Sequence, residues 1–427
     1  MIDHRIVREN PEIVREALRK RRSDFDLDHL IDLEARRREL LAVENLRADK
    51  NRLSEQIGAA YREGETERAE SLKEQVAELS RQIEEQEDEL EQVEAGFEAL
   101  MLDLPNIPHD DVPDGCDETE NPVLYERGEQ PKFDFDPLPH WEIGDRLGIL
   151  DFERAAKMAS ARFVMNVGAA ATMERALISF MLDVHTREHG YTEVIPPYLA
   201  NSRSLIGTAT LPKFEEDQFK TREGLYLIPT AEIPLTNIHQ DEILGPDDLP
   251  RYYTAYTACF RREAGSAGQE SRGLTRLHQF NKVELMKFVE PGTSDDELEQ
   301  LTLNAEVILQ RLELPYRRII LCTGDLGFQP QRTYDLDVWM PGMNRWVEIS
   351  SCSQYGEFQA RRCNTRYRPE PEAAPRFVHT MNGSGLAAGR CLAAIIENYQ
   401  QADGTVAVPE ALRPYMGGMV EISGRTH

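Results

Sequence analysis

A proline-free run from about residue 27 to residue 104 limits more than any other feature what this chain can fold into. Its second half repeats mostly apolar residues in alternating steps of four and three, the heptad seam of a coiled coil. The members of this seam are Leu72, Val76, Leu79, Ile83, Gln86, Leu90, Val93, Phe97 and Leu100. A less regular stripe lies upstream at Leu33, Leu40, Leu46, Lys50, Leu53 and Ile57, and the glycines Gly58 and Gly64 indicate a reversal between the two. We therefore expect two helices of roughly 38 residues, each about 57 Å long, packed as an antiparallel hairpin.

The two halves of this hairpin differ in charge. Basic clusters at Arg19 to Arg22 and at Arg36 to Arg38 lie on or just before the first helix, whereas the second helix is strongly acidic. If the hairpin contacts a phosphate backbone, the first helix must make the contact. The alternative is that these charges only solvate the coiled coil and pair across it, and for the hairpin taken alone the pattern favours that interpretation.

Length and charge narrow the class of protein. With 427 residues the chain is too long for one compact core, and two or three domains are expected. The formal net charge of −27 means that any binding of nucleic acid must be local. No apolar run is long enough to cross a membrane and the first residues lack a signal-peptide core, so we expect a cytoplasmic protein. The six cysteines show no C-x-x-C spacing, which speaks against a zinc site or a disulfide framework.

The remainder of the chain is predicted to be an α+β domain. Residues 105–139 are rich in Pro, Asp and Gly and are interpreted as a linker. Beyond it, short apolar strand-like runs mix with helical stretches such as 168–188 and 294–312, without the regular alternation of a doubly wound sheet. A mainly antiparallel sheet is expected. Neither G-x-G-x-x-G after a strand nor G-x-x-x-x-G-K-S/T occurs, so nucleotide binding by either of those motifs is excluded.

Four clusters carry residues suited to chemistry. They are Phe260-Arg261-Arg262-Glu263 with the glycine-rich loop and His278-Gln279-Phe280 after it, Glu348-Ile349-Ser350-Ser351, Asn382-Gly383-Ser384 running on to Gly389-Arg390, and Thr230-Ala231-Glu232. Arginine forks suit phosphate oxygens, and an aromatic ring nearby can stack on a base. Carboxylate and hydroxyl oxygens suit Mg²⁺, and strand alternation would place Glu348 with Ser350 and Ile349 with Ser351 on opposite faces. Each cluster alone is equally explained by ordinary turns, an edge strand or a tight helix start.

In this order and at these separations, the clusters resemble the bacterial-type seryl-tRNA synthetases, a family of class II aminoacyl-tRNA synthetases. The likeness extends over almost the whole chain, from the basic-then-acidic hairpin and the Leu104-Pro105-Asn106-Ile107-Pro108-His109 junction to Gly389-Arg390. It implies an N-terminal helical domain with a coiled-coil arm for tRNA (1–104), a linker (105–139) and a catalytic domain with a six-stranded antiparallel sheet flanked by helices (140–427). It also implies a homodimer, ATP and Mg²⁺, the substrates L-serine and tRNA(Ser), and tRNA(Sec) as a further substrate, with no membrane partner.

The resemblance also implies roles for single residues. Arg261, Glu263 and Arg390 match the catalytic positions, with Arg390 holding the γ-phosphate of a bent ATP. The positions implied for serine are Thr230, Ala231, Glu232, Arg261, Glu284, Asn382 and Ser384. Those implied for ATP are Arg261, Arg262, Glu263, Phe280, Glu348, Ile349, Ser350, Ser351 and Arg390, and the Mg²⁺ ligands are Glu348 and Ser351.

Two other functions compete with serine–tRNA ligation. Some relatives of this family load an amino acid onto a carrier-protein thiol, but these relatives lack the helical arm and bind zinc through a cysteine. An RNA-binding scaffold with a decayed site would be expected to have lost Arg261, Glu348 or Arg390, and all three are present.

Overall fold

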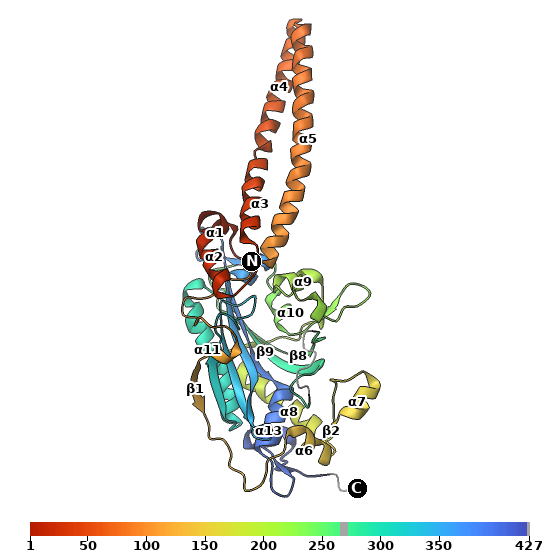
Figure 1. Cartoon of the computed structure of the whole chain (residues 1–427), viewed down its shortest axis with the longest axis vertical. Helices are drawn as coiled ribbons and strands as arrows, with labels where there is room; N and C mark the ends of the chain where they lie inside the picture. The colour runs from red at the N-terminus through yellow and green to blue at the C-terminus, as the bar shows by residue number, and fades with distance from the viewer. Residues whose placement is uncertain (265–271, 425–427) are drawn as a thin grey trace. The chain divides into compact units, whose positions relative to one another are not determined.

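The computed structural model describes residues 1–264 and 272–424, which form two compact units (Figure 1). One unit comprises residues 2–19 and 23–104, and the other comprises residue 1, residues 20–22 and residues 105–427. Within the described residues, no helix has both the length and the apolar character needed to span a membrane. All six cysteines are free, five of them buried and Cys116 exposed.

The first unit is a helical hairpin, as predicted. Its elements are α1 (His4–Glu9), α2 (Pro11–Lys20), α3 (Leu27–Leu40), α4 (Val43–Glu63) and α5 (Thr66–Asp103). Both α3 and α4 pack along α5, which is one continuous helix of 38 residues. The reversal falls at Gly64, whose φ of +79° closes α4 in the left-handed conformation that glycine adopts without strain.

The prediction of a single first helix was wrong, because the chain breaks between α3 and α4. At the break, the Ala42 N–H donates to the carbonyl of Glu39, a tighter bond than the α-helical one to residue i−4. The seam advances by six residues from Leu40 to Leu46, where a regular heptad needs seven. The local tightening therefore coincides with the irregular step, and Leu40 and Val43 both remain buried beside it.

Much of the basic charge on the first half of the hairpin pairs with the acidic helix. Arg36 and Arg47 each bridge to α5, at 2.7 Å from Glu89 and 2.6 Å from Glu87. Arg37 lies 3.1 Å from Glu94. Among the described residues, Arg38, Lys50 and Arg62 of α3 and α4 form no ion pair, although Arg62 Nε donates to the backbone carbonyl of Gly58 at 3.0 Å.

Arg21, in the predicted basic cluster, has a different role. Its guanidinium donates to the backbone carbonyls of Leu326, Gly327 and Pro330 at 2.6 to 2.9 Å, and to that of Asn106, all within the second unit. Burial lowers the pKa of Arg21 to about 9. It is therefore a structural anchor for loop carbonyls and is not available to a phosphate.

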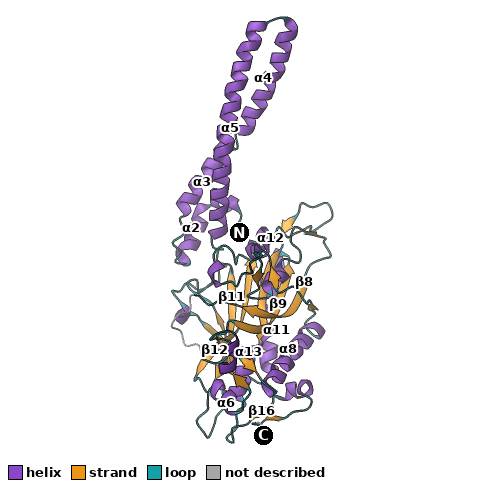
Figure 2. Ribbon diagram, turned by 90° about the vertical axis from the view of Figure 1, so that its right-hand side faces the viewer, coloured by secondary structure: helices purple, strands orange, loops and turns teal. Residues whose placement is uncertain are grey.

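The second unit is built on an eight-stranded sheet, seen with its covering helices in Figure 2. The strand order is β1 (Val123–Arg127), β10 (Tyr316–Ile320), β11 (Arg332–Met340), β12 (Arg345–Gly356), β15 (His379–Ala387), β9 (Gln279–Val289), β8 (Arg251–Phe260) and β4 (Thr192–Glu193). Every pairing is antiparallel except that of β4 with β8. The mainly antiparallel sheet is confirmed, and the edge strands β1 and β4 extend the expected six strands to eight. β1 lies inside the segment interpreted as a linker.

One face of this sheet is covered by α8 (Ala169–Arg187), α11 (Ser294–Arg311) and α13 (Ala388–Asn398). Because strand side chains alternate, Val283 and Leu285 of β9 enter the core with these helices, together with Leu336 of β11 and Met381 of β15. The residues between them face the other way. This second face of the sheet carries the polar side chains described below.

Shorter elements connect these parts. The helices are α6 (His140–Arg146), α7 (Phe152–Met158), α9 (Ser202–Gly207), α10 (Glu232–Thr236) and α12 (Phe358–Cys363). The strands are β2 (Leu150–Asp151), β3 (Met165–Asn166), β5 (Leu199–Ala200), β6 (Tyr226–Leu227), β7 (Ile243–Leu244), β13 (Arg366–Tyr367), β14 (Arg376–Phe377), β16 (Val406–Ala407) and β17 (Glu421–Ile422).

Candidate active site

A cavity of about 410 Å³ opens on the polar face of the sheet. Side chains from the four central strands β9, β11, β12 and β15 line it together with residues of connecting segments. They are Thr230, Glu232, Arg261, Glu263, Leu274, Thr275, Arg276, Leu277, Phe280, Lys282, Glu284, Leu321, Asp325, Asp335, Glu348, Ile349, Ser351, Ser353, Tyr355, Asn382, Ser384, Ala387, Gly389 and Arg390. Most of the site residues that the sequence singled out are therefore brought together.

Glu284 is the most enclosed acid of the cavity. Its fully buried carboxylate accepts hydrogen bonds from Thr230 Oγ1 at 3.0 Å and from Asn382 Nδ2 at 2.8 Å, and Lys282 Nζ lies 2.5 Å away. A carboxylate offers about four acceptor positions. With three of them occupied by the protein, Glu284 can accept one further hydrogen bond from a donor in the cavity.

Glu232 is a second acid at the same end. It begins α10, and Gln359 Nε2 donates to its Oε1 at 2.6 Å. Burial and the neighbouring Glu284 raise the pKa of Glu232 to about 7. Ala231 beside it is fully buried in a small apolar core and does not line the cavity, so its side chain is structural.

Basic residues line the cavity as well. Arg261 follows β8, and its guanidinium lies 5.2 Å from the centre of the Phe280 ring while its Nε donates to the carbonyl of Pro229 at 3.3 Å. Glu263, with a φ of +51°, turns its carboxylate to 3.3 Å from Arg276. Arg262 between them is exposed and is not among the residues that line the cavity, and its place at ATP stays a prediction. The glycines at 265 and 268 of the predicted loop lie outside the described residues.

Arg390 in the first turn of α13 joins three segments. Its Nη1 donates to the backbone carbonyl of Glu348 at 2.7 Å and to that residue's Oε1 at 3.0 Å. Its Nε donates to the carbonyl of Thr275 at 3.2 Å. The nearby guanidinium lowers the pKa of Glu348, so this acid is ionised.

The expected alternation along β12 was wrong because the strand contains a β-bulge. Leu336 pairs with Ser350 but Asp337 pairs with Glu348, which leaves Ile349 as an extra residue. Glu348 consequently joins Ile349 and Ser351 at the cavity. Ser350 turns away and donates to the carbonyl of Ser384 at 2.7 Å. Its side chain therefore does not line the cavity, although the sequence placed Ser350 among the ATP-binding residues.

Four charged residues of the cavity had been assigned no role, and one of them, Asp325, accepts a hydrogen bond from Asn121 Nδ2 at 2.7 Å. Lys282 and Arg276 add positive charge, and the strand period of two that links Phe280 to Glu284 would have placed Lys282 on the same face. Asp335 faces Ser351 across β11 and β12. Only the tertiary pairing of these strands reveals Asp335, because the sequence around it shows no motif.

The surroundings of Asp335 bear on metal binding. Its buried Oδ1 has no hydrogen-bond partner in the described structure, and burial together with the charge of Glu348 raises its pKa well above the usual value. No cluster of three or more His, Cys, Asp or Glu able to hold a metal occurs among residues 1–264 and 272–424. A site with only Asp335 and Glu348 as carboxylates fits Mg²⁺, which proteins commonly hold through one or two carboxylates while substrate phosphates supply the rest.

Comparison with known proteins adds to this geometry. The model of the class II tRNA synthetase core domain (G, H, P, S and T) matches residues 213–399, and that of the seryl-tRNA synthetase N-terminal domain matches residues 1–108. A serine–tRNA ligase of Geobacillus kaustophilus is 56% identical over 420 residues, covering 98% of this chain and 99% of that protein. One from Carboxydothermus hydrogenoformans is 54% identical over 98% of both chains.

The solved structures that are similar to this chain over its whole length come from the same family as the sequence relatives. The crystal structure of seryl-tRNA synthetase from Pyrococcus horikoshii complexed with ATP superposes with a TM-score of 0.94 at 36% identity, covering all of both chains. The cytoplasmic serine–tRNA ligase from Naegleria fowleri in complex with AMP gives a TM-score of 0.88 at 27% identity, over 100% of this chain and 99% of that chain.

Proposed function

Because the chain belongs to the seryl-tRNA synthetase family of class II enzymes, we propose that its cavity binds serine at the Glu284 end and ATP at the Arg261 and Arg390 end. The activity of the family is the ATP-dependent attachment of serine to tRNA. The observation that carries the assignment is the buried Glu284, with one acceptor position left, in the same cavity as two arginines suited to phosphate.

At the serine end, Glu284 accepts the hydrogen bond of the substrate hydroxyl, with Thr230, Asn382 and Ser384 around it. Glu232 in its ionised form receives the amino group. A site built to bond a hydroxyl rejects the analogue that lacks it, because buried polar groups are then left unpaired. This accounts for selection of serine over alanine.

At the ATP end, the adenine stacks on Phe280, Arg261 meets the α-phosphate and the serine carboxylate, and Arg390 holds the γ-phosphate. The serine carboxylate attacks the α-phosphorus, pyrophosphate leaves and a seryl-adenylate forms. The guanidinium groups offset the negative charge that develops on the phosphoryl oxygens. The terminal adenosine hydroxyl of tRNA then attacks the serine carbonyl carbon, which releases AMP.

Mg²⁺ fits beside Glu348 and Ser351. We infer that these two residues hold it and that Asp335, whose buried oxygen lacks a partner, supports them. When bound, the ion neutralises phosphate charge and orients the triphosphate. The side chains of Ser350, Arg262 and Ala231 are not part of this assignment, since they do not line the cavity.

For the rest of the chain we propose the division that the resemblance implied. Residues 1–104 carry the tRNA-binding arm, 105–139 the connection and 140–427 the aminoacylation domain. The tRNA substrates are tRNA(Ser) and tRNA(Sec), the enzyme acts as a cytoplasmic homodimer, and Arg38 and Lys50 are the arm's candidates for phosphate contacts.

Serine-dependent exchange between pyrophosphate and ATP, measured with and without tRNA, tests the proposal. We expect exchange with serine in the absence of tRNA and charging of tRNA when it is added. Exchange with alanine or glycine but not with serine would instead favour a carrier-protein ligase. No exchange with any amino acid would favour a scaffold with a decayed site.

A further inference from the structure

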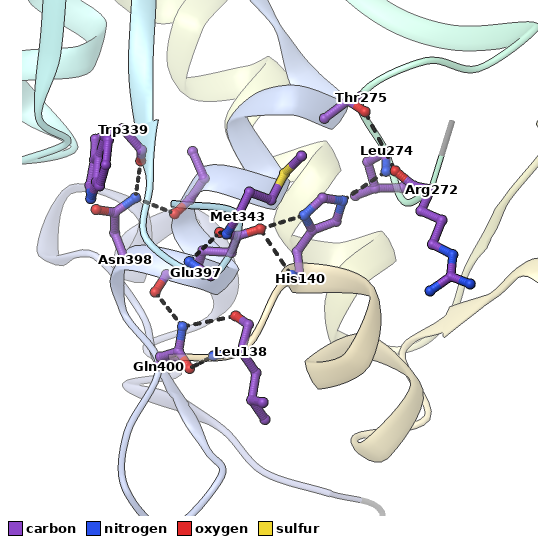
Figure 3. Close-up of polar contacts among 12 residues, drawn as sticks. Leu138, His140, Arg272, Leu274, Thr275, Trp339, Met343, Glu397, Asn398 and Gln400 are labelled. Carbon is purple, nitrogen blue, oxygen red and sulfur yellow. Dashed lines mark hydrogen bonds and ion pairs between the residues drawn. The ribbon is translucent and has the colours of Figure 1, made fainter. Parts of the chain in front are cut away.

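A buried hydrogen-bond network centred on Glu397 and His140 reaches the wall of the cavity at Leu274, and neither Glu397 nor His140 belongs to the motifs or to the proposed roles. Glu397 in the last turn of α13 is fully buried and accepts four hydrogen bonds (Figure 3). Its Oε1 receives the backbone N–H of His140 at 3.0 Å and the Nδ1 of the same residue at 2.7 Å. Its Oε2 receives the N–H groups of Gly342 at 2.8 Å and Met343 at 3.2 Å.

These contacts define the hydrogen positions of the His140 ring. The three backbone partners of Glu397 can only donate, so both of its oxygens act as acceptors, as in a carboxylate. The backbone N–H of Leu274, which can only donate, lies 2.8 Å from Nε2 of His140, so Nε2 is the acceptor. The ring proton therefore sits on Nδ1, which donates to Oε1 of Glu397. Gln400 and Leu138 exchange two further hydrogen bonds, at 2.8 and 3.1 Å, which hold the chain just before His140.

Leu274 belongs to the segment 272–277, which forms one wall of the cavity. Leu274, Thr275, Arg276 and Leu277 all line it, and Arg276 lies beside Glu263. α13 thus holds this segment at two points, through Arg390 to the Thr275 carbonyl and through Glu397 and His140 to the Leu274 N–H. The two α13 residues are seven positions apart, or about 10 Å along the helix.

We propose that Glu397 and His140 are positioning residues for ATP, which set segment 272–277 by keeping His140 in its Nδ1–H form. The inference rests on the proposed function, in which Arg390, bonded to Thr275 of this segment, holds the γ-phosphate. Replacing Glu397 by Gln keeps the shape but adds an NH₂ group where every partner is a donor. When that NH₂ faces His140, the ring is driven to its Nε2–H form, which opposes the N–H of Leu274 and releases the segment.

The test is serine-dependent pyrophosphate exchange by Glu397→Gln. We expect the KM for ATP to rise roughly tenfold, the equivalent of about 1.4 kcal/mol, while the KM for serine stays within about twofold. The matched control is Glu306→Gln, which neutralises another fully buried acid that accepts hydrogen bonds from Tyr125 and Tyr316. Glu306 does not line the cavity. Equal effects of the two variants, or equal changes in the two KM values, would overturn the inference.

A second variant serves if Glu397→Gln does not fold. Gly273 has a φ of +77°, and a Cβ there would lie 2.1 Å from Nε2 of His140, so Gly273→Ala displaces the segment from the same ring atom. We expect a similar rise in the KM for ATP. Both changes break the same contact, between Nε2 of His140 and the N–H of Leu274. The KM for ATP of the double variant should therefore be no higher than that of the more impaired single variant, and multiplicative effects would refute the coupling.

The ring form can be observed directly in protein labelled with ¹⁵N-histidine, with the His140 signals identified by their loss in His140→Gln. The expected spectrum shows the hydrogen on Nδ1, and a hydrogen on Nε2 would contradict the proposal. Wild-type protein without serine-dependent exchange would instead refute the proposed function itself, so the two failures are distinguishable.

Discussion

Replacing Glu284 by alanine should weaken serine binding and also destabilise the fold, and the structure allows these two effects to be separated. The change removes the acceptor proposed for the serine hydroxyl, and it also leaves Lys282 without its partner at 2.5 Å. Lys282 is only 8% exposed, so its ammonium group cannot be solvated freely where it stands. Thr230 and Asn382 lose an acceptor as well.

The magnitudes follow from these contacts. Removing one partner of a buried ion pair lowers the free energy of unfolding by about 3–5 kcal/mol, because an uncompensated charge remains. Losing a hydrogen bond to a charged acceptor costs about 1.5–3 kcal/mol, so kcat/KM for serine should fall about 10- to 150-fold. The KM for ATP should change little, since the hydrogen bonds of Arg261 and Arg390 go to Pro229, Thr275 and Glu348 and not to Glu284.

The double variant Glu284→Ala/Lys282→Met distinguishes the two effects. An apolar side chain of similar length removes the stranded charge, so urea denaturation should recover most of the lost stability. Pyrophosphate exchange should show that the defect with serine persists. If the double variant regained its affinity for serine, or if Glu284→Ala raised the KM for serine and ATP equally, the assignment of Glu284 to the hydroxyl would be refuted.

Three further predictions concern the remaining parts of the site and the arm. Because the pKa of Glu232 is raised to about 7 in the folded protein, its protonated form stabilises the fold at low pH, and that contribution is lost as pH rises from about 4.5 through 7. Glu232→Gln should flatten this pH dependence of stability in urea denaturation. The kcat/KM for serine should rise with pH through about 7 only while Glu232 is present. Asp335→Asn should raise the Mg²⁺ concentration that gives half-maximal exchange, whereas Asp325→Asn, at a cavity acid already bonded to an asparagine side chain, should change it less. Arg38→Glu combined with Lys50→Glu should leave exchange intact but lower tRNA charging several-fold and weaken its salt dependence, and unchanged charging would show that these residues only solvate the coiled coil.

The sequence was most informative where one periodicity dominated. The seam from Leu72 to Leu100 predicted α5 almost to its ends, because a coiled-coil helix buries one continuous stripe whatever the rest of the chain does. The break at Leu41 was not predicted. A stripe shows that a helix buries a face, but it does not show where the backbone tightens by one hydrogen bond to correct an irregular step.

At the candidate site, alternation and resemblance located most of the cavity but not its details. Glu284 and Phe280 share a face of β9, and the same rule would have included Lys282. Asp335 could not be found in this way, because only the pairing of β11 with β12 brings it to Ser351. His140 lies far from Glu397 in the sequence, and a hydrogen-bond network between such distant residues leaves no local pattern.

The extra residue in β12 also bears on how far this enzyme can be redesigned. Deleting Ile349 would restore uninterrupted pairing with β11, and regular ladders are what thermostabilising engineering usually favours. In the shortened strand Glu348 would directly precede Ser350, which points away from the cavity, so alternation would keep Glu348 on the cavity side and the deletion would remove only Ile349 from the lining. Regular pairing could therefore be restored here while the Glu348 carboxylate stays at the cavity, and the cost of strand idealisation would be the loss of one apolar lining residue.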